Sequence, residues 1–99
     1  MTKENLFQQV SAKVTEITGL SSAQLLSSTT EECTDARYLL VRSLSMLNLT
    51  DIDIAHLIGR TRQAVSHLRI SYKRSRKWLL ANQWQILVKW LENEYFLCK

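Results

Sequence analysis

The stretch TDIDIAHLIGRTRQAVSHL, residues 50–68, decides the fold because it predicts two short helices joined by a tight turn. Thr50 and Asp53 have the Thr-x-x-acid spacing of a helix cap, and the apolar residues behind them predict a compact helix over 51–58. Gly59 is expected to end this helix, since glycine supplies a turn at little steric cost. The stretch therefore has the pattern of a helix-turn-helix.

The contact between these two helices follows from side-chain size and helical spacing. The second helix is expected to begin near Thr61, and Ala55 has the small side chain that two helices crossing on a short turn need where they touch. Helical spacing then predicts an inner face that packs on the first helix. The residues expected on this inner face are Ala64, Val65, Leu68 and Tyr72.

Caps and apolar spacing predict further helices before this pair. A first helix over 5–18 is expected to end at Gly19, and the capping-box spacing in SSAQLL predicts a short second helix. The polar stretch SSTTEECT, residues 27–34, is expected to form a loop. Thr34 is then expected to cap the central core helix, whose apolar residues cover a wide arc over 35–47.

The boundary between the last two helices has two solutions. Ser75 can interrupt the fifth helix, or that helix can continue to Asn82. We prefer Asn82, because Asn82 and Gln85 have capping-box spacing ahead of an amphipathic run that ends near Leu97.

The composition favours one all-α domain over residues 1–99. The 99 residues include no proline, two glycines and 45% apolar residues, so helix breakers are few and a core is available. We expect a compact bundle of about six helices that contains the helix-turn-helix. Neither a signal-peptide pattern nor an apolar run of membrane-spanning length is present, which predicts a cytoplasmic protein with no membrane partner.

The net charge of +4 is unevenly distributed. Residues 1–53 contain four basic and seven acidic side chains, whereas residues 54–91 contain eight basic side chains and no acidic one. A basic segment of this kind indicates an anionic partner.

The predicted fifth helix places much of this charge on its outer face. Arg62, Ser66, Arg69, Lys73 and Arg76 follow helical spacing, and Gln63, His67, Ile70, Arg74 and Lys77 flank them. Arginine can bond guanine in the major groove, glutamine can bond adenine, and Ala64 or Ile70 can meet a thymine methyl group. The base-reading candidates are Arg62, Gln63, Ser66 and His67. The candidates for contact with the DNA backbone are Arg60, Thr61, Arg69, Lys73, Arg74 and Arg76.

The sequence carries no pattern typical of an enzyme, a metal site or a cofactor site. His56 and His67 lack a spaced carboxylate or cysteine partner, and Cys33 and Cys98 have no CxxC spacing. We therefore expect a non-enzymatic protein without metal, cofactor or small-molecule ligand.

Several motifs in this order carry a resemblance to a known family. The segment VTEITGLSSAQLL is similar to an opening helix, turn and short helix, and DARYLLVRSL is similar to an Ala/Pro-Arg-Gln helix. LTDIDIAHLIGR and VSH are similar to the helix-turn-helix signature and to a Val-x-His in the recognition helix. Over nearly its whole length the chain thus resembles the C-terminal DNA-binding domain of the bacterial replication initiator DnaA. The resemblance implies contact between His67 and double-stranded DNA, and a nucleoid-associated protein.

The chain departs from that family in three respects. Glu31 and Glu32 stand where the family has a basic loop that enters the minor groove. RTRQA, residues 60–64, replaces the base-reading Arg-Asp-His-Thr-Thr, so a different target sequence is expected. No nucleotide-binding motif such as GxxxxGK[ST] is present, so the resemblance implies a reused module without ATP-driven activity.

Two readings of the function remain at this point. The first is a sequence-specific DNA-binding regulator or replication accessory module. The second is a protein-interaction adaptor that keeps the fold without reading DNA, motivated by the acidic residues 31–32 and by the Trp-rich last helix. That helix is expected to pack in the core, and a homodimer or protein partner is the alternative use of its apolar surface.

Overall fold

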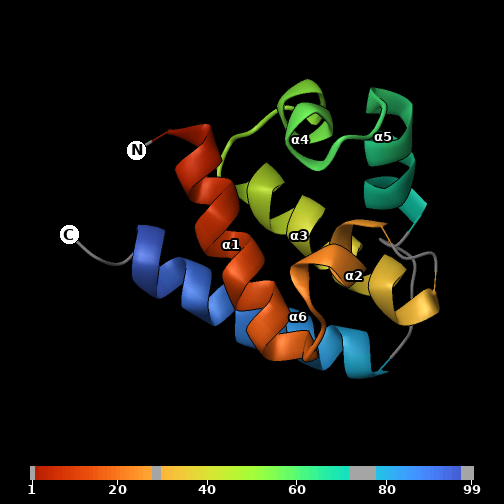
Figure 1. Ribbon diagram of the computed structural model, residues 1–99. Coiled ribbons are helices and arrows are strands. Elements are labelled where there is room, and N and C mark those ends of the chain that lie inside the picture. The colour runs from red at the N-terminus through yellow and green to blue at the C-terminus, as the bar shows by residue number, and fades with distance from the viewer. Residues whose placement is uncertain (1, 28–29, 72–77, 97–99) are drawn as a thin grey trace.

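The chain is all-helical over the residues that the computed structural model describes, 2–27, 30–71 and 78–96 (Figure 1). The elements are α1 (Lys3–Thr18), α2 (Ser22–Ser27), α3 (Glu31–Met46), α4 (Asp51–Ile58), α5 (Arg62–Ser71), α6 (Trp78–Leu91) and the π-helical segment η2 (Glu92–Phe96). The predicted all-α bundle of about six helices is confirmed. Its radius of gyration, 12.5 Å, is that of a compact chain of this length.

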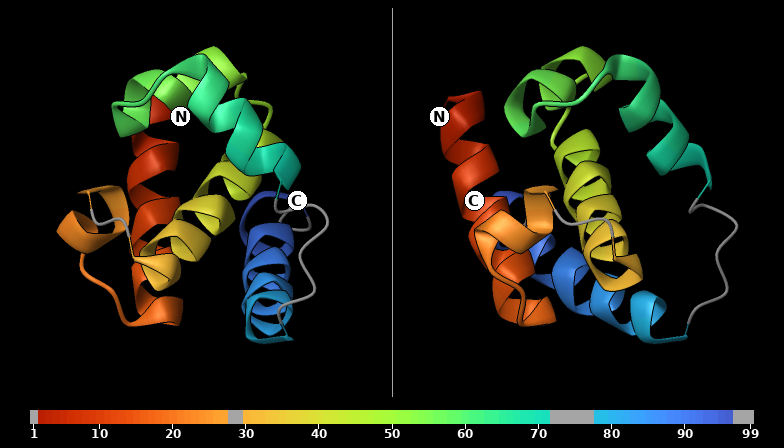
Figure 2. Two further views of the ribbon diagram at one scale, coloured as in Figure 1. Left: turned by 90° about the vertical axis from the view of Figure 1, so that its right-hand side faces the viewer. Right: turned by 45° about the vertical axis from the view of Figure 1, so that its right-hand side comes forward.

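Helix α3 runs through the middle of the bundle, as the sequence predicted (Figures 1 and 2). Nine of its residues are buried, and it packs against α1, α2, α4, α5 and α6. Helices α4 and α5 lie at one end of the molecule and α6 lies at the other (Figures 1 and 2), and α1 crosses α6 in the view of Figure 1. The α4–α5 pair therefore packs on the core helix α3 with one side and exposes the other side to solvent.

The first two helices follow the predicted local chemistry, with one change at the start of α1. Helix α1 begins at Lys3, two residues before the predicted start, with Thr2 as its cap, and Gly19 ends it with φ 76°. At α2, Ser21 N–H donates to Gln24 Oε1 over 2.9 Å and Gln24 N–H donates to Ser21 Oγ over 3.2 Å. The predicted capping box is thus formed, and it turns Leu25 into the core.

The start of α3 corrects the sequence prediction. Thr30 rather than Thr34 is the cap, since Thr30 Oγ1 accepts from the backbone N–H of Cys33. Glu31 and Glu32 therefore belong to the first helical turn, and the predicted loop over 27–34 is wrong in its second half. Carboxylates in the first turn favour the positive end of the helix dipole, which accounts for the earlier start.

The start of α6 is a second correction. Helix α5 ends at Ser71 and α6 begins at Trp78, so Asn82 lies inside α6 and does not mark a boundary between helices. Leu80 is buried in the core, and its packing extends the helix ahead of the capping-box pattern. The alternative boundary at Ser75 lies outside the described residues.

Two of the three tryptophans are used in packing. The Arg42 guanidinium lies 4.1 Å from the centre of the Trp84 ring, and Arg42 also donates to Tyr38 Oη. Trp90 meets Tyr95 edge to face, with 5.7 Å between ring centres. The first contact joins α6 to α3 and the second joins η2 to α6, whereas Trp78 is 76% exposed.

No helix in the described part of the chain combines the length and apolar character that crossing a membrane requires.

Candidate nucleic-acid interface

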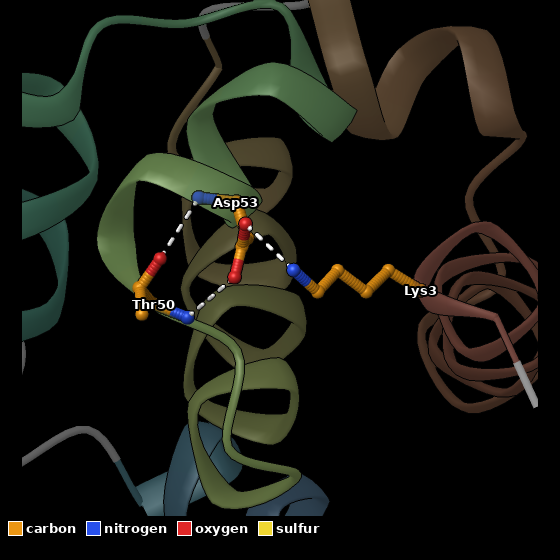
Figure 3. Close-up of polar contacts among 3 residues, drawn as sticks. All are labelled: Lys3, Thr50 and Asp53. Carbon is orange, nitrogen blue, oxygen red and sulfur yellow. Dashed lines mark hydrogen bonds and ion pairs between the residues drawn. The ribbon is translucent and has the colours of Figure 1, made fainter.

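The N-terminus of α4 is held by a complete capping box (Figure 3). Asp53 N–H donates to Thr50 Oγ1 and Thr50 N–H donates to Asp53 Oδ2, each over 3.2 Å. The Lys3 ammonium donates to Asp53 Oδ1 over 3.1 Å, which ties α1 to α4. The hydrogen bond from Thr50 N–H, followed by the bond from Lys3, lowers the pKa of Asp53.

The turn between α4 and α5 has the predicted chemistry. Gly59 ends α4 in the left-handed region with φ 71°, and Ala55 is buried. Thr61 Oγ1 accepts from Ala64 N–H over 3.1 Å, so Thr61 caps α5 and Arg62 is its first residue. The two helices are therefore connected by the three residues 59–61.

The inner face of α5 follows the prediction in part. Val65 is buried and Leu68 is half-buried against the core, as expected. Ala64 is exposed, so its predicted inward position is wrong. The reason is rotational: α5 turns its Val65–Leu68 edge toward α3, and Ala64 lies beside the cap at the solvent side.

The four predicted base-reading residues line one groove. The groove has a volume of about 670 Å³ and lies between the start of α4 and the outer face of α5. Its lining residues are Thr50, Asp51, Ile52, Arg62, Gln63, Ser66, His67 and Ile70. Arg62, Gln63 and His67 are exposed and Ser66 is half-buried, so donors and acceptors stand beside the exposed apolar side chains of Ile52 and Ile70.

Arg69 is committed to a contact within the protein. Its Nε donates to Asp51 Oδ1 over 3.2 Å and its Nη2 donates to Asp51 Oδ2 over 2.9 Å. This hydrogen bonding raises the pKa of Arg69 above its ordinary value. A two-bond contact of this geometry fixes α5 relative to α4.

Two further arginines close the end of α2. Arg37, in α3, is buried, and its Nε donates to the carbonyl oxygen of Leu25 over 3.0 Å. Arg60 Nη2 donates to the carbonyl oxygen of Leu26 over 3.0 Å. Cations suit the negative end of a helix, so these side chains satisfy carbonyls that α2 cannot pair itself.

Arg37 is the residue of this region that the sequence did not single out. It lines a cavity of about 160 Å³ together with Arg60 and His67. Periodicity within α3 places Arg37 on a helix without indicating that its guanidinium reaches α2. The contact between Arg37 and α2 becomes visible only in the tertiary structure, where Arg37 is buried.

Three predicted contact residues lie outside the described part of the chain, namely Lys73, Arg74 and Arg76, and so does the flanking Lys77. The same holds for Tyr72, predicted to face inward, and for Cys98. His56 is exposed on α4, and Cys33 is a buried free thiol. Among residues 2–27, 30–71 and 78–96, no three His, Cys, Asp or Glu side chains gather as a metal site would require.

A second groove lies at the other end of the bundle. Its volume is about 560 Å³, and it brings Glu31, Glu32 and Asp35 of α3 beside Trp78 and Leu79 of α6. Acidic residues 31 and 32 thus belong to a different surface from the groove that Arg62 lines.

No protein-family model matches the chain, and no curated protein and no solved structure matches it.

Proposed function

We propose that this protein binds double-stranded DNA without catalysing a reaction, with α4 and α5 as a helix-turn-helix and α5 in the major groove. The observation that carries this proposal is the gathering of Arg62, Gln63, Ser66 and His67 on a single groove. These side chains come from the first turns of α5, the part of a recognition helix that reaches base edges. The residues quoted above for the resemblance to the DnaA domain agree with this assignment.

Arg62 is the central residue of the proposal. It is exposed and makes no hydrogen bond or ion pair within the described part of the chain, so its guanidinium is available to O6 and N7 of guanine. Gln63 is exposed beside it and has the donor and acceptor that adenine requires. Arg60 and Thr61 lie at the turn, where contact with a phosphate would orient the helix.

Selection of bound duplexes from a random pool, followed by titration of the selected site, tests this function. Arg62→Ala is expected to cost about 1 to 3 kcal/mol on the selected site and much less on unrelated duplex. Lys89→Ala is the matched control, because Lys89 is an exposed cation on α6 at the other end of the molecule. Equal losses for both variants on every sequence would contradict base reading by Arg62.

A protein-interaction adaptor is the second candidate. The specific observation in its favour is that Trp78 and Leu79, 76% and 62% exposed, line the groove that contains three carboxylates. Such a surface suits a protein partner better than a nucleic acid, because its charge repels phosphate. A homodimer formed through α6 belongs to the same alternative.

The variant pair Trp78→Ala and Leu79→Ala separates the two candidates. DNA affinity is expected to be unchanged, because both residues lie away from the α4–α5 groove. Sedimentation of the wild-type chain at high concentration then reports self-association. A chain that binds no duplex DNA but forms a dimer sensitive to these two substitutions would favour the adaptor.

A DNA-binding regulator is expected to associate with the nucleoid.

A further inference from the structure

Asp51 takes part in two features of the structure: an ion pair with Arg69 and the lining of the candidate DNA-binding groove. As the first residue of α4 it pairs through both oxygens with Arg69, a residue in the last turn of α5. The two side chains are 23% and 39% exposed, so solvent and solutes reach the pair. The ion pair is therefore held by two hydrogen bonds, but another anion can still reach Arg69 and compete with Asp51.

The same carboxylate faces the candidate DNA-binding groove. Among the described residues that line it, Asp51 is the only acid, next to the candidates Arg62 and Gln63. Phosphate and carboxylate accept the same hydrogens of a guanidinium group. Asp51 takes the Nε hydrogen and one Nη2 hydrogen of Arg69, so a DNA phosphate must either displace this carboxylate or approach the remaining hydrogens against its repulsion.

We propose that Asp51 limits the affinity of this protein for DNA: it withholds Arg69 from the DNA backbone, so that binding depends more on the base contacts of Arg62 and Gln63. This inference rests on the proposed function. Backbone contacts strengthen binding to every sequence alike, whereas base contacts distinguish one site from another. Removing one backbone contact lowers affinity for unrelated DNA and keeps the preference for the target site.

The test compares salt dependence for three variants on the selected duplex and on unrelated duplex. In Asp51→Asn, Arg69 is released and gains a phosphate, so the slope of log affinity against log salt should steepen by about 0.9. The fall in affinity between 50 and 200 mM salt should then be about 3.5-fold larger than in the wild type. Affinity should rise by a similar factor for both duplexes, so the ratio between selected and unrelated duplex should stay near the wild-type value.

Asp53→Asn is the matched control, because it removes the same charge from the same helical turn. Asp53 does not line the groove, and it bonds Lys3. Its slope should equal that of the wild type. In the double variant Asp51→Asn with Arg69→Gln, the wild-type slope should return.

Arg69→Gln alone provides a readout that does not require the Asp51 variant to fold. The wild-type Arg69 is withheld from phosphate, so its removal should leave the slope unchanged. A slope that flattens by about 0.9 in Arg69→Gln would overturn the inference, because Arg69 would then already contact a phosphate.

Two other outcomes would also overturn it: an equal steepening in the two aspartate variants, or a steepening that persists without Arg69. In each of these cases DNA binding itself stands. A wild-type chain that binds no duplex at all would instead refute the proposed function, and the inference with it.

Discussion

Helices α3 and α5 both carry arginine and serine among apolar residues, yet α3 buries Arg37 and Ser43, whereas Arg62 of α5 is exposed. In α3, Arg37 is 6% exposed, and the buried Ser43 hydroxyl donates to the Leu39 carbonyl over 2.7 Å. In α5, Arg62 is exposed and Val65 is the buried residue of the helix. The buried polar residues of α3 therefore serve the fold, because burial without a partner is costly. Arg62 on α5 remains available to a ligand.

The arginines extend the same comparison. Arg37 and Arg60 bond α2 carbonyls, Arg69 bonds Asp51, and Arg62 has no such contact within the described residues. Positive charge in the sequence is thus a poor guide to which cation meets an external anion. Contacts with distant segments decide it.

The largest expected effect is on the free energy of unfolding, for a substitution in the core helix α3. Leu39→Ala should lower the free energy of unfolding by about 2 to 5 kcal/mol, because Leu39 is fully buried in α3 and its loss leaves a cavity. Ile70→Ala on α5, where Ile70 is 56% exposed, should change it by about 0.5 kcal/mol or less. Urea denaturation of both variants measures the difference, and similar midpoints would refute the contrast between the helices.

A smaller effect on stability is expected to distinguish Arg37 from Arg62. Arg37→Ala should cost about 1 to 3 kcal/mol of stability, because the buried carbonyl of Leu25 loses its donor. Arg62→Ala should leave stability within about 0.5 kcal/mol of the wild type while weakening DNA binding. Thermal and urea unfolding report stability, and titration with the selected duplex reports binding. Equal destabilisation would show that Arg62 also serves the fold.

The smallest effect concerns Asp53 and pH. Its pKa in the folded state is lowered, so its contribution to stability is complete above the pKa of the unfolded chain and is lost as pH falls through the folded-state value. The loss should therefore occur below about pH 4. Asp53→Asn does not titrate, so it should lose less stability than the wild type between pH 5 and pH 2.5, measured by urea midpoints. The same loss in both proteins would remove Asp53 from the acid response.

Much of the fold could be predicted from local sequence chemistry. The capping boxes at Ser21 and Thr50 and the glycine ends of α1 and α4 involve residues at most four apart, so the sequence displays them directly. The sequence prediction missed the boundaries at Thr30 and Trp78: at α3 both Thr30 and Thr34 are possible caps, and α6 starts ahead of the Asn82 pattern because Leu80 packs in the core. The candidate site was predicted as a helix face, and its four base-reading candidates do share one groove.

The sequence by itself determined that the chain forms helices, where α2, α4 and α5 begin, and that the basic residues concentrate after residue 53. Only the tertiary structure decided what each basic residue touches. Arg60 meets a carbonyl 34 residues away and Arg69 meets a carboxylate 18 residues away, separations that helical periodicity does not relate. The physical reason is that capping and amphipathic spacing are local, whereas satisfying a half-buried charge depends on which helices pack together.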